Sequence, residues 1–204
     1  MVEEKAIYSI EKFLVSRRLM YWQVYLHKTV LSAEKMLVRI IERARQLAQA
    51  GDAVSSSSPV LDHFVKLQEA ELDLDQFCLL DDFDVMSAVK RWMFHSDRVL
   101  ATLSRWLINR QLLKVKFQAT PYDENYVEEL RWSVSRALAI TAAEARYFVF
   151  TGEATNTTYN PADEKINILF KNGSVRDISQ VDNALIHQTL SSPVKKFYLC
   201  FCET

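Results

Sequence analysis

The sequence predicts an α+β fold, in which a long N-terminal helix and a helical hairpin are followed by a small antiparallel sheet with short helices. Two observations predict this class. Apolar residues recur at three- and four-residue steps through most of the first 140 residues, as in amphipathic helices. From Arg146 onward, aromatic and branched residues alternate with polar ones, as in strands. With 204 residues, 49% of them hydrophobic, the chain suffices for one large domain or two small ones.

The first expected element is a helix from Ser9 to Ala50, a run of 42 residues without Gly or Pro. Ser9 is expected to cap its start, and Gly51 to close it. An unbroken helix of this length would reach about 60 Å, so a bend is expected at Thr29–Ser32, or a partner at one end. The expected buried stripe comprises Ile10, Phe13, Met20, Val24, Leu31, Leu37, Ile41, Ala44 and Ala48.

The middle of the chain is expected to hold a linker and a helical hairpin. Residues 51–59 are rich in turn-forming residues. A short strand or an extended loop is expected around Leu72, Asp73, Leu74 and Asp75. Two amphipathic helices follow, the first capped by Asp81 or Asp82 and the second by Ser96, and they pair naturally as a hairpin.

The remaining chain is expected to form a strand at 112–118 and an amphipathic helix at 122–140. Three further strands are expected, and the Asn172-Gly173 pair favours a hairpin turn within the second of them. A short helix capped by Asp182 is expected before the last strand. The last three strands are 146–154, 166–179 and 194–202. We therefore expect two domains, a long helix at 1–51 and an α+β domain at 60–204.

Composition limits the possible functions. The formal net charge is −1, so the chain has no overall basic field for nucleic acid. Residues 1–50 carry nine Lys/Arg against five Asp/Glu, a local +4, whereas residues 51–100 carry four against ten, a local −6. Three cysteines make no disulfide framework, which favours a reducing compartment. Without a long apolar run or a signal peptide, a soluble cytoplasmic protein that does not enter a membrane is expected.

The sequence contains no recognisable catalytic centre. Its four histidines are scattered, and no phosphate-binding glycine loop or nucleophile motif is present. We expect no metal site made by this chain, because a site needs three or four converging ligands. The acidic group Asp81, Asp82 and Asp84 is better explained by a helix start, and Cys200 and Cys202 by strand packing.

One face of the first helix is the main indication of function. At about 100° per residue, Arg17, Tyr21, Tyr25 and Lys28 fall within a sector of roughly 80°. Two cations and two phenols would suit a phosphorylated ligand. The alternative is that cations and tyrosines line the edge of a buried stripe, and spacing alone favours this second interpretation.

The segment from Ile7 to Ala44 resembles the long helix that follows the metal-binding part of HD-domain phosphohydrolases. This family includes the deoxynucleoside triphosphate triphosphohydrolases. The resemblance is carried by an arginine, a tyrosine eight residues later, and then x-H-K, here Arg17, Tyr25, His27 and Lys28. The block 81–117 resembles the family's C-terminal helical pair, and residues 166–201 resemble the terminal sheet of its bacterial members.

The resemblance implies roles for these residues. Arg17 would contact the triphosphate of a nucleotide, and Tyr25 its sugar. His27 and Lys28 match positions that hold a regulatory nucleotide at a subunit interface in regulated members. Leu26 stands where those members have glutamine, which leaves the choice of substrate open.

The family's metal-binding His, His-Asp pair and Asp would all precede Met1. Met1 therefore looks like an artificial start or a truncation within a longer protein. By this resemblance, the chain is the C-terminal part of a metal-dependent hydrolase of (deoxy)nucleoside triphosphates. Alone it should be inactive, with a divalent metal (Mg, Mn, Zn or Fe) in the absent HD domain. Its expected partners are that domain, the nucleotide and further copies of itself in a homo-oligomer. The alternative is a non-enzymatic interaction or oligomerisation module, anchored by Tyr21 and an exposed Trp22.

Overall fold

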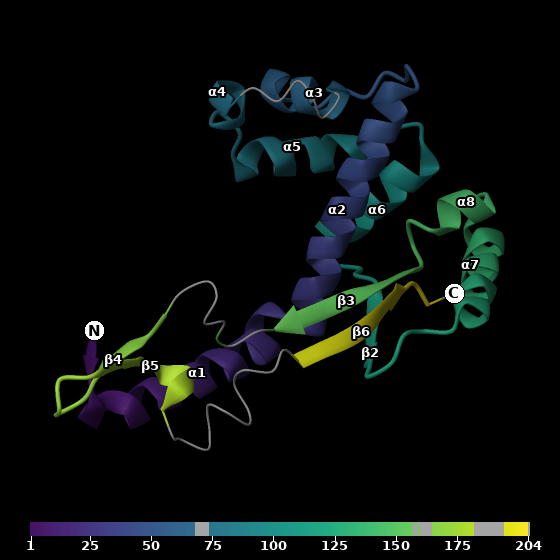
Figure 1. Cartoon of the computed structure of the whole chain (residues 1–204). Helices are drawn as coiled ribbons and strands as arrows, with labels where there is room; N and C mark the ends of the chain where they lie inside the picture. The colour runs from purple at the N-terminus through teal and green to yellow at the C-terminus, as the bar shows by residue number, and fades with distance from the viewer. Residues whose placement is uncertain (68–73, 157–158, 160–164, 182–193, 204) are drawn as a thin grey trace. The chain divides into compact units, whose positions relative to one another are not determined.

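The computed structural model describes residues 1–67, 74–156, 159, 165–181 and 194–203 (Figure 1). It confirms the α+β class. The chain forms two compact units, and each is described by itself. The first comprises Met1–Val30, Phe117–Pro121 and Gly152–Tyr198, and the second comprises Leu31–Lys116, Tyr122–Thr151 and Leu199–Thr204. The expected domain boundary, 1–51 against 60–204, stays a prediction.

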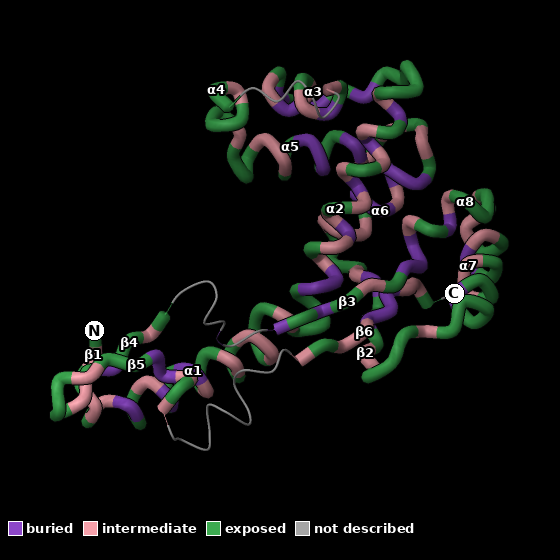
Figure 2. The backbone as a smooth tube through the Cα atoms, viewed as in Figure 1, coloured by how far each residue is buried: buried purple, intermediate pink, exposed green. Residues whose placement is uncertain are grey.

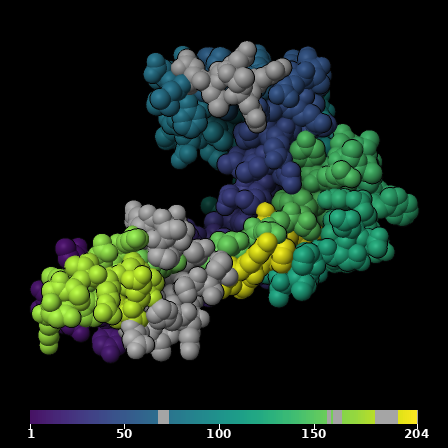
Figure 3. Space-filling view, viewed as in Figure 1, coloured from purple at the N-terminus to yellow at the C-terminus, as the bar shows by residue number. Residues whose placement is uncertain are grey.

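In the first unit, helix α1 (Ile7–Met20) packs on a small mixed sheet. Its strands follow the order β1-β4-β5, with β1 (Val2–Glu3) parallel to β4 (Asn167–Leu169) and β4 antiparallel to β5 (Val175–Asp177). In the space-filling view, the atoms of β4 and β5 lie against the start of the chain (Figure 3). The buried core comprises Ile7, Leu14, Tyr159, Ile168 and Ile178.

The β4–β5 turn confirms the hairpin that the Asn-Gly pair predicts. The Gly173 N–H donates to the Phe170 carbonyl at 2.9 Å, and the Phe170 N–H donates to the Ser174 carbonyl at 2.9 Å. Gly173 has φ +80°, a left-handed conformation that glycine adopts without steric penalty. The expected helix at 182–190, with its cap Asp182, lies outside the described residues.

The long helix differs from the prediction at its start and at its break. A 3-10 turn at Glu4–Ala6 leads directly into α1, so Ser9 lies inside the helix and caps nothing. The expected bend at Thr29–Ser32 is also wrong, because a π-helical turn at Tyr21–Tyr25 ends the first helix before α2 (Lys28–Gln49) begins. At the other end Gly51, with φ +92°, closes α2 as expected.

The expected buried stripe holds only in part (Figure 2). In α2, Leu31 and Ala44 are buried as predicted, but in α1 and the π turn Phe13, Met20 and Val24 are exposed. The sheet contacts the other side of α1, at Ile7 and Leu14. Apolar periodicity therefore identified a helix correctly but not which of its faces is covered.

The second unit is mainly helical. The expected hairpin is confirmed, since α5 (Asp82–Trp92) packs against α6 (Arg98–Ile108). The other helices are α3 (Pro59–Lys66), α4 (Leu74–Phe77), α7 (Glu124–Leu138) and α8 (Ala142–Ala145). Its largest fully buried side chains are Trp92, Phe148, Met36, Ile40, Leu100 and Leu103.

Helix caps in this unit follow local chemistry. Asp81 caps α5 in a capping box with Asp84, as an expected helix start. The cap of α6 is Asp97 and not Ser96, because the Asp97 carboxylate accepts from the Leu100 N–H at 2.8 Å. Leu74 and Asp75 begin the helix α4 and form no strand, while Leu72 and Asp73 lie outside the described residues.

A second sheet has the order β2-β6-β3, from β2 (Lys114–Gln118), β6 (Val194–Phe201) and β3 (Phe150–Asn156). These three strands confirm the expected segments. Gly152 lies beneath the ring of Tyr198, and a side chain at residue 152 would overlap that ring. The absence of a Cβ at Gly152 is thus what lets the ring cross the strand.

Candidate ligand-binding face

Arg17, Tyr21 and Tyr25 form a row along the first helical segment, which we call the Arg17–Tyr25 face. The Arg17 guanidinium carbon lies 5.7 Å from the centroid of the Tyr21 ring. The Tyr21 and Tyr25 ring centroids are 5.1 Å apart, with 51° between the ring planes. Arg17 and Tyr25 are exposed, the latter by 52%, and Tyr21 is half-buried. The structure thus brings together three of the four residues that the helical wheel grouped.

A π-helical turn shapes this face. The Leu26 N–H donates to the Tyr21 carbonyl at 2.7 Å, and the His27 N–H donates to the Val24 carbonyl at 3.3 Å. Such turns are rare in proteins and are frequent at functional sites. Sequence reasoning missed it, because no Gly, Pro or Ser marks the segment Tyr21–His27.

His27 and Lys28 lie beyond the π turn. Lys28 is exposed and is the first residue of α2. The helical wheel that grouped it with Arg17 assumed one unbroken helix, whereas the π turn interrupts the helix before Lys28. The His27 Nδ1 atom accepts a hydrogen bond from the Thr29 N–H at 3.3 Å. This is the position and the bond of a helix N-cap, so His27 has a structural role at the start of α2.

Trp22 is covered more than the sequence suggested. Instead of the expected exposed anchor, its ring is half-buried, with the Lys196 Nζ atom 4.3 Å from the ring centroid. The adjoining turn is held by the Asn156 side chain, whose amide donates to the Arg18 carbonyl at 3.5 Å. An exposed apolar stripe runs instead through Phe13, Met20 and Val24, at steps of seven and four residues.

Glu11 is a second polar feature of α1. Its side chain belongs to a residue that is only 2% exposed, between the buried Ile7 and Leu14 of the same helix. Within the part of the chain that the structure describes, neither carboxylate oxygen has a hydrogen-bond partner. A buried carboxylate without a partner is destabilising in an apolar core.

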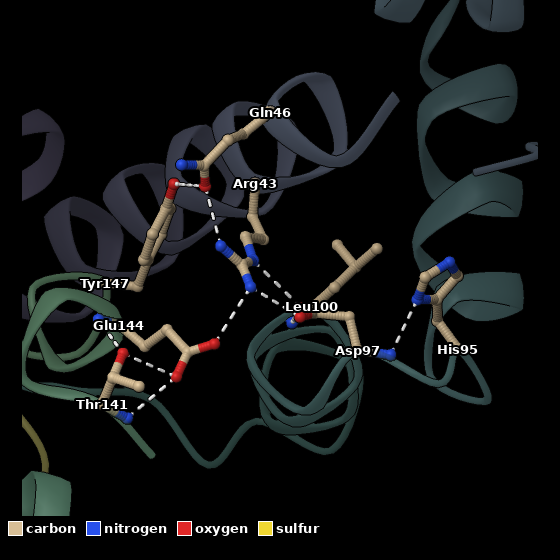
Figure 4. A network of polar contacts seen from close by, with 8 residues as sticks. All are labelled: Arg43, Gln46, His95, Asp97, Leu100, Thr141, Glu144 and Tyr147. Atoms are coloured by element: carbon tan, nitrogen blue, oxygen red, sulfur yellow. Dashed lines mark hydrogen bonds and ion pairs between the residues drawn. The ribbon is translucent and has the colours of Figure 1, made fainter. Parts of the chain in front are cut away.

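The densest polar network lies in the second unit around Arg43 (Figure 4). Arg43 donates to both carboxylate oxygens of Asp97, at 3.1 and 2.6 Å, and to Glu144 at 3.1 Å. It also donates to Gln46 at 2.7 Å, and the Tyr147 hydroxyl donates to the same Gln46 oxygen at 2.9 Å. Since Asp97 caps α6 and Glu144 completes the capping box of α8, Arg43 ties α2 to the starts of two other helices.

Protonation follows from these contacts. The hydrogen bond to Asp97 raises the pKa of Arg43. Burial raises the pKa of Asp97, but hydrogen bonds from Arg43 and from the Leu100 N–H outweigh it and hold this pKa below its ordinary value. Because all three guanidinium nitrogens of Arg43 already donate to side chains, we interpret this network as structural.

Cys200 and Cys202 show the features of packed rather than reactive thiols. Burial raises the pKa of Cys200 to about 12 and that of Cys202 to about 11, so both thiols stay protonated near neutral pH.

Over the described ranges, no group of three or more His, Cys, Asp or Glu could hold a metal ion. Among the helices that the structure describes, none is long and apolar enough to cross a membrane.

Comparison with known proteins places the Arg17–Tyr25 face in a recognised region. Residues 1–57 match the family model of the HD associated region. The uncharacterized protein YwfO of Bacillus subtilis is 28% identical over 186 residues, which cover 88% of this chain and 41% of that protein. A solved phosphohydrolase structure from Bacteroides thetaiotaomicron matches the whole chain and 52% of its own, with 42% identity and a TM-score of 0.87.

The chain thus spans about half the length of the relatives that it matches. The matches support an HD-domain-associated protein that is related to a phosphohydrolase. At this level, they confirm the resemblance that the Arg17, Tyr25, His27 and Lys28 pattern suggested.

Proposed function

We propose that this chain acts with an HD domain in a metal-dependent phosphohydrolase of (deoxy)nucleoside triphosphates. The observation that carries the proposal is that the Arg17–Tyr25 face lies wholly within the 1–57 match to the HD associated region. The phosphohydrolase from Bacteroides thetaiotaomicron, similar over the full chain, supports the reaction class.

The proposed roles follow from side-chain chemistry. The exposed Arg17 guanidinium neutralises phosphate oxygens and donates two parallel hydrogen bonds to them. Tyr25, exposed at the other end of the row, stacks on or hydrogen-bonds the sugar. These contacts bind and orient the nucleotide, and Arg17 also stabilises charge that develops on the phosphate oxygens during hydrolysis.

The divalent metal (Mg, Mn, Zn or Fe) belongs to the HD domain in this proposal, since the described residues of this chain offer no ligand group. When bound there, it would lower the pKa of a water molecule and so supply the nucleophile. His27 and Lys28 stay candidates for a regulatory nucleotide or a subunit contact in a homo-oligomer. For His27, this role would add to its hydrogen bond with Thr29.

The proposal is tested by Arg17→Ala in the chain joined to its proposed HD domain, which we call the full-length protein. Its kcat/KM for deoxynucleoside triphosphates with Mn²⁺ should fall by about 30- to 1,000-fold, equivalent to roughly 2–4 kcal/mol for one charged donor. Lys12→Ala is the matched control, because it removes an exposed cation from another side of the same helix. Unchanged hydrolysis by Arg17→Ala would overturn the assignment of this face.

A second candidate is a non-enzymatic interaction or oligomerisation module, which the exposed stripe Phe13, Met20 and Val24 favours. In that case the full-length protein would not hydrolyse nucleotides with any divalent metal. Phe13→Asp would lower the molar mass measured by light scattering, and the thermal midpoint would become independent of protein concentration. Metal-dependent hydrolysis abolished by Arg17→Ala would instead exclude this candidate.

A further inference from the structure

Tyr21 occupies the middle of the Arg17–Tyr25 face, and the family resemblance implies no role for it. Arg17 lies one helical turn before it and Tyr25 one turn after it, the spacing at which helical side chains meet. Each neighbour contacts the Tyr21 ring, the guanidinium at 5.7 Å and the second phenol at 5.1 Å between centroids. Tyr21 is thus the shared neighbour of the two residues proposed to contact the nucleotide.

Arg17 needs such a neighbour. An exposed arginine has several rotatable bonds and loses considerable conformational entropy when it is fixed on a ligand. A guanidinium group stacked on an aromatic face is restricted to fewer orientations before the ligand arrives. Because preorganised groups lose less entropy on binding, the stacked arginine binds phosphate more tightly than a free one would.

Tyr21 itself is well anchored. Its side chain is half-buried, and its carbonyl accepts the 2.7 Å hydrogen bond from the Leu26 N–H that closes the π turn. A tyrosine side chain also has only two rotatable torsions, so a half-buried tyrosine ring loses little conformational entropy when it is held in place. The π turn positions the backbone that carries the ring, and partial burial restricts the ring itself.

We propose that Tyr21 is a positioning residue of the nucleotide site, whose ring holds the Arg17 guanidinium and the Tyr25 phenol in place to meet one nucleoside triphosphate. This inference rests on the proposed function. The ring carries the role, and the Tyr21 hydroxyl is not required for it.

The test compares Tyr21→Leu with Tyr21→Phe in the full-length protein, assayed with dATP, dCTP, dGTP and dTTP singly and with Mn²⁺. Tyr21→Leu removes both ring contacts and should lower kcat/KM by roughly fivefold to thirtyfold. Tyr21→Phe keeps both ring contacts, so its kcat/KM should stay within about twofold of the wild-type value. Tyr8→Leu, which removes an exposed tyrosine of the preceding helix α1, is the control and should change nothing.

A double-mutant cycle separates positioning from general loss of structure. If Tyr21 acts through Arg17, Tyr21→Leu should lower kcat/KM by less than about threefold when Arg17 is already alanine. A purely structural effect would give the same factor in both backgrounds. Thermal midpoints of all variants are measured alongside, and Tyr21→Met replaces Tyr21→Leu in the cycle if the latter does not fold.

The outcomes distinguish the two proposals. If Arg17→Ala retains full activity, the proposed function of this face fails. If Arg17→Ala loses activity but Tyr21→Leu does not, or if the two losses simply multiply, only the role of Tyr21 is overturned. A loss in Tyr21→Phe as large as that in Tyr21→Leu would also overturn it, because the hydroxyl would then be the group that acts.

Discussion

Arg43 illustrates how much a single side chain can hold in this fold. Removing it leaves the Asp97 and Glu144 carboxylates close together with no cation between them. Arg43→Met should therefore lower the free energy of unfolding by about 2–4 kcal/mol. Urea denaturation of the purified chain at pH 7 measures this loss, and Arg91→Met, at an exposed arginine on α5, is the control. A loss no larger than that of the control would contradict the interpretation of the network.

The same pair makes a prediction about pH. The pKa of Asp97 is lower in the folded chain than its ordinary value, so its contribution to stability is present above that value and is lost as pH falls through the folded pKa. The stability difference between the wild type and Arg43→Met should accordingly be full at pH 7 and shrink below about pH 4. Denaturation curves of both proteins at pH 7, 5 and 3 measure it. A difference that stayed constant to pH 3 would show that Asp97 does not titrate in this way.

Glu11 should behave in the opposite sense to Arg43. Because its carboxylate is buried without a partner among the described residues, an apolar side chain of similar length should fit the site better. Glu11→Met is expected to raise the free energy of unfolding by about 1–3 kcal/mol, measured by urea denaturation. Glu4→Met, at the 3-10 turn before α1, is a control that should have little effect. A destabilised Glu11→Met chain would indicate that the carboxylate has a role that offsets its burial.

At the scale of elements, two predicted helix ends are correct, whereas the expected caps Ser9 and Ser96 are wrong. Asp81 and Gly51 act where the sequence placed them, because capping depends on residues within a few positions of one another. The exposed side of α1 was not predictable, since the sheet that covers Ile7 comes largely from residues 167–177. The π turn at Tyr21–Tyr25 has no local marker, so the break between the helices was placed too late.

The end of α2 offers a direct test of this local chemistry. Gly51 has φ +92°, where a Cβ is strained, and the Asp52 N–H bonds back to the Leu47 carbonyl at 3.0 Å. Gly51→Ala should lower the free energy of unfolding by about 1 kcal/mol, and Gly51→Asn by less, because asparagine tolerates positive φ better. Thermal denaturation of the three proteins should rank them in that order. Equal stability of Gly51→Ala and the wild type would contradict the conformation at this residue.

For the whole molecule, tertiary pairs set the limit of what the sequence could predict. Arg43 and Asp97 are 54 residues apart, and Arg43 and Glu144 are 101 apart, so no local pattern indicated that they meet. The Arg17, Tyr21 and Tyr25 row lies within one helical segment, and its grouping could be predicted for that reason. Lys28 could not be placed, because an interrupted helix no longer follows a single wheel.

The isolated 204-residue chain should not hydrolyse nucleoside triphosphates, even with added Mn²⁺ or Mg²⁺. The proposed site needs a metal, and the described residues provide no ligand group for one. A phosphate-release assay on highly purified chain, alongside the full-length protein, measures this difference. Reproducible metal-dependent turnover by the isolated chain would contradict the division of labour proposed here.

Because Gly152 packs beneath the ring of Tyr198, the residue type allowed at one of these positions depends on the residue at the other. A methyl group at 152 cannot coexist with the tyrosine ring, and a smaller residue at 198 would leave the bare strand unprotected. In homologous proteins, glycine at position 152 should occur together with an aromatic residue at position 198. Bulkier residues at 152 should occur together with small residues at 198. Substitutions at residues 152 and 198 should therefore covary, although the two residues are 46 positions apart in the sequence.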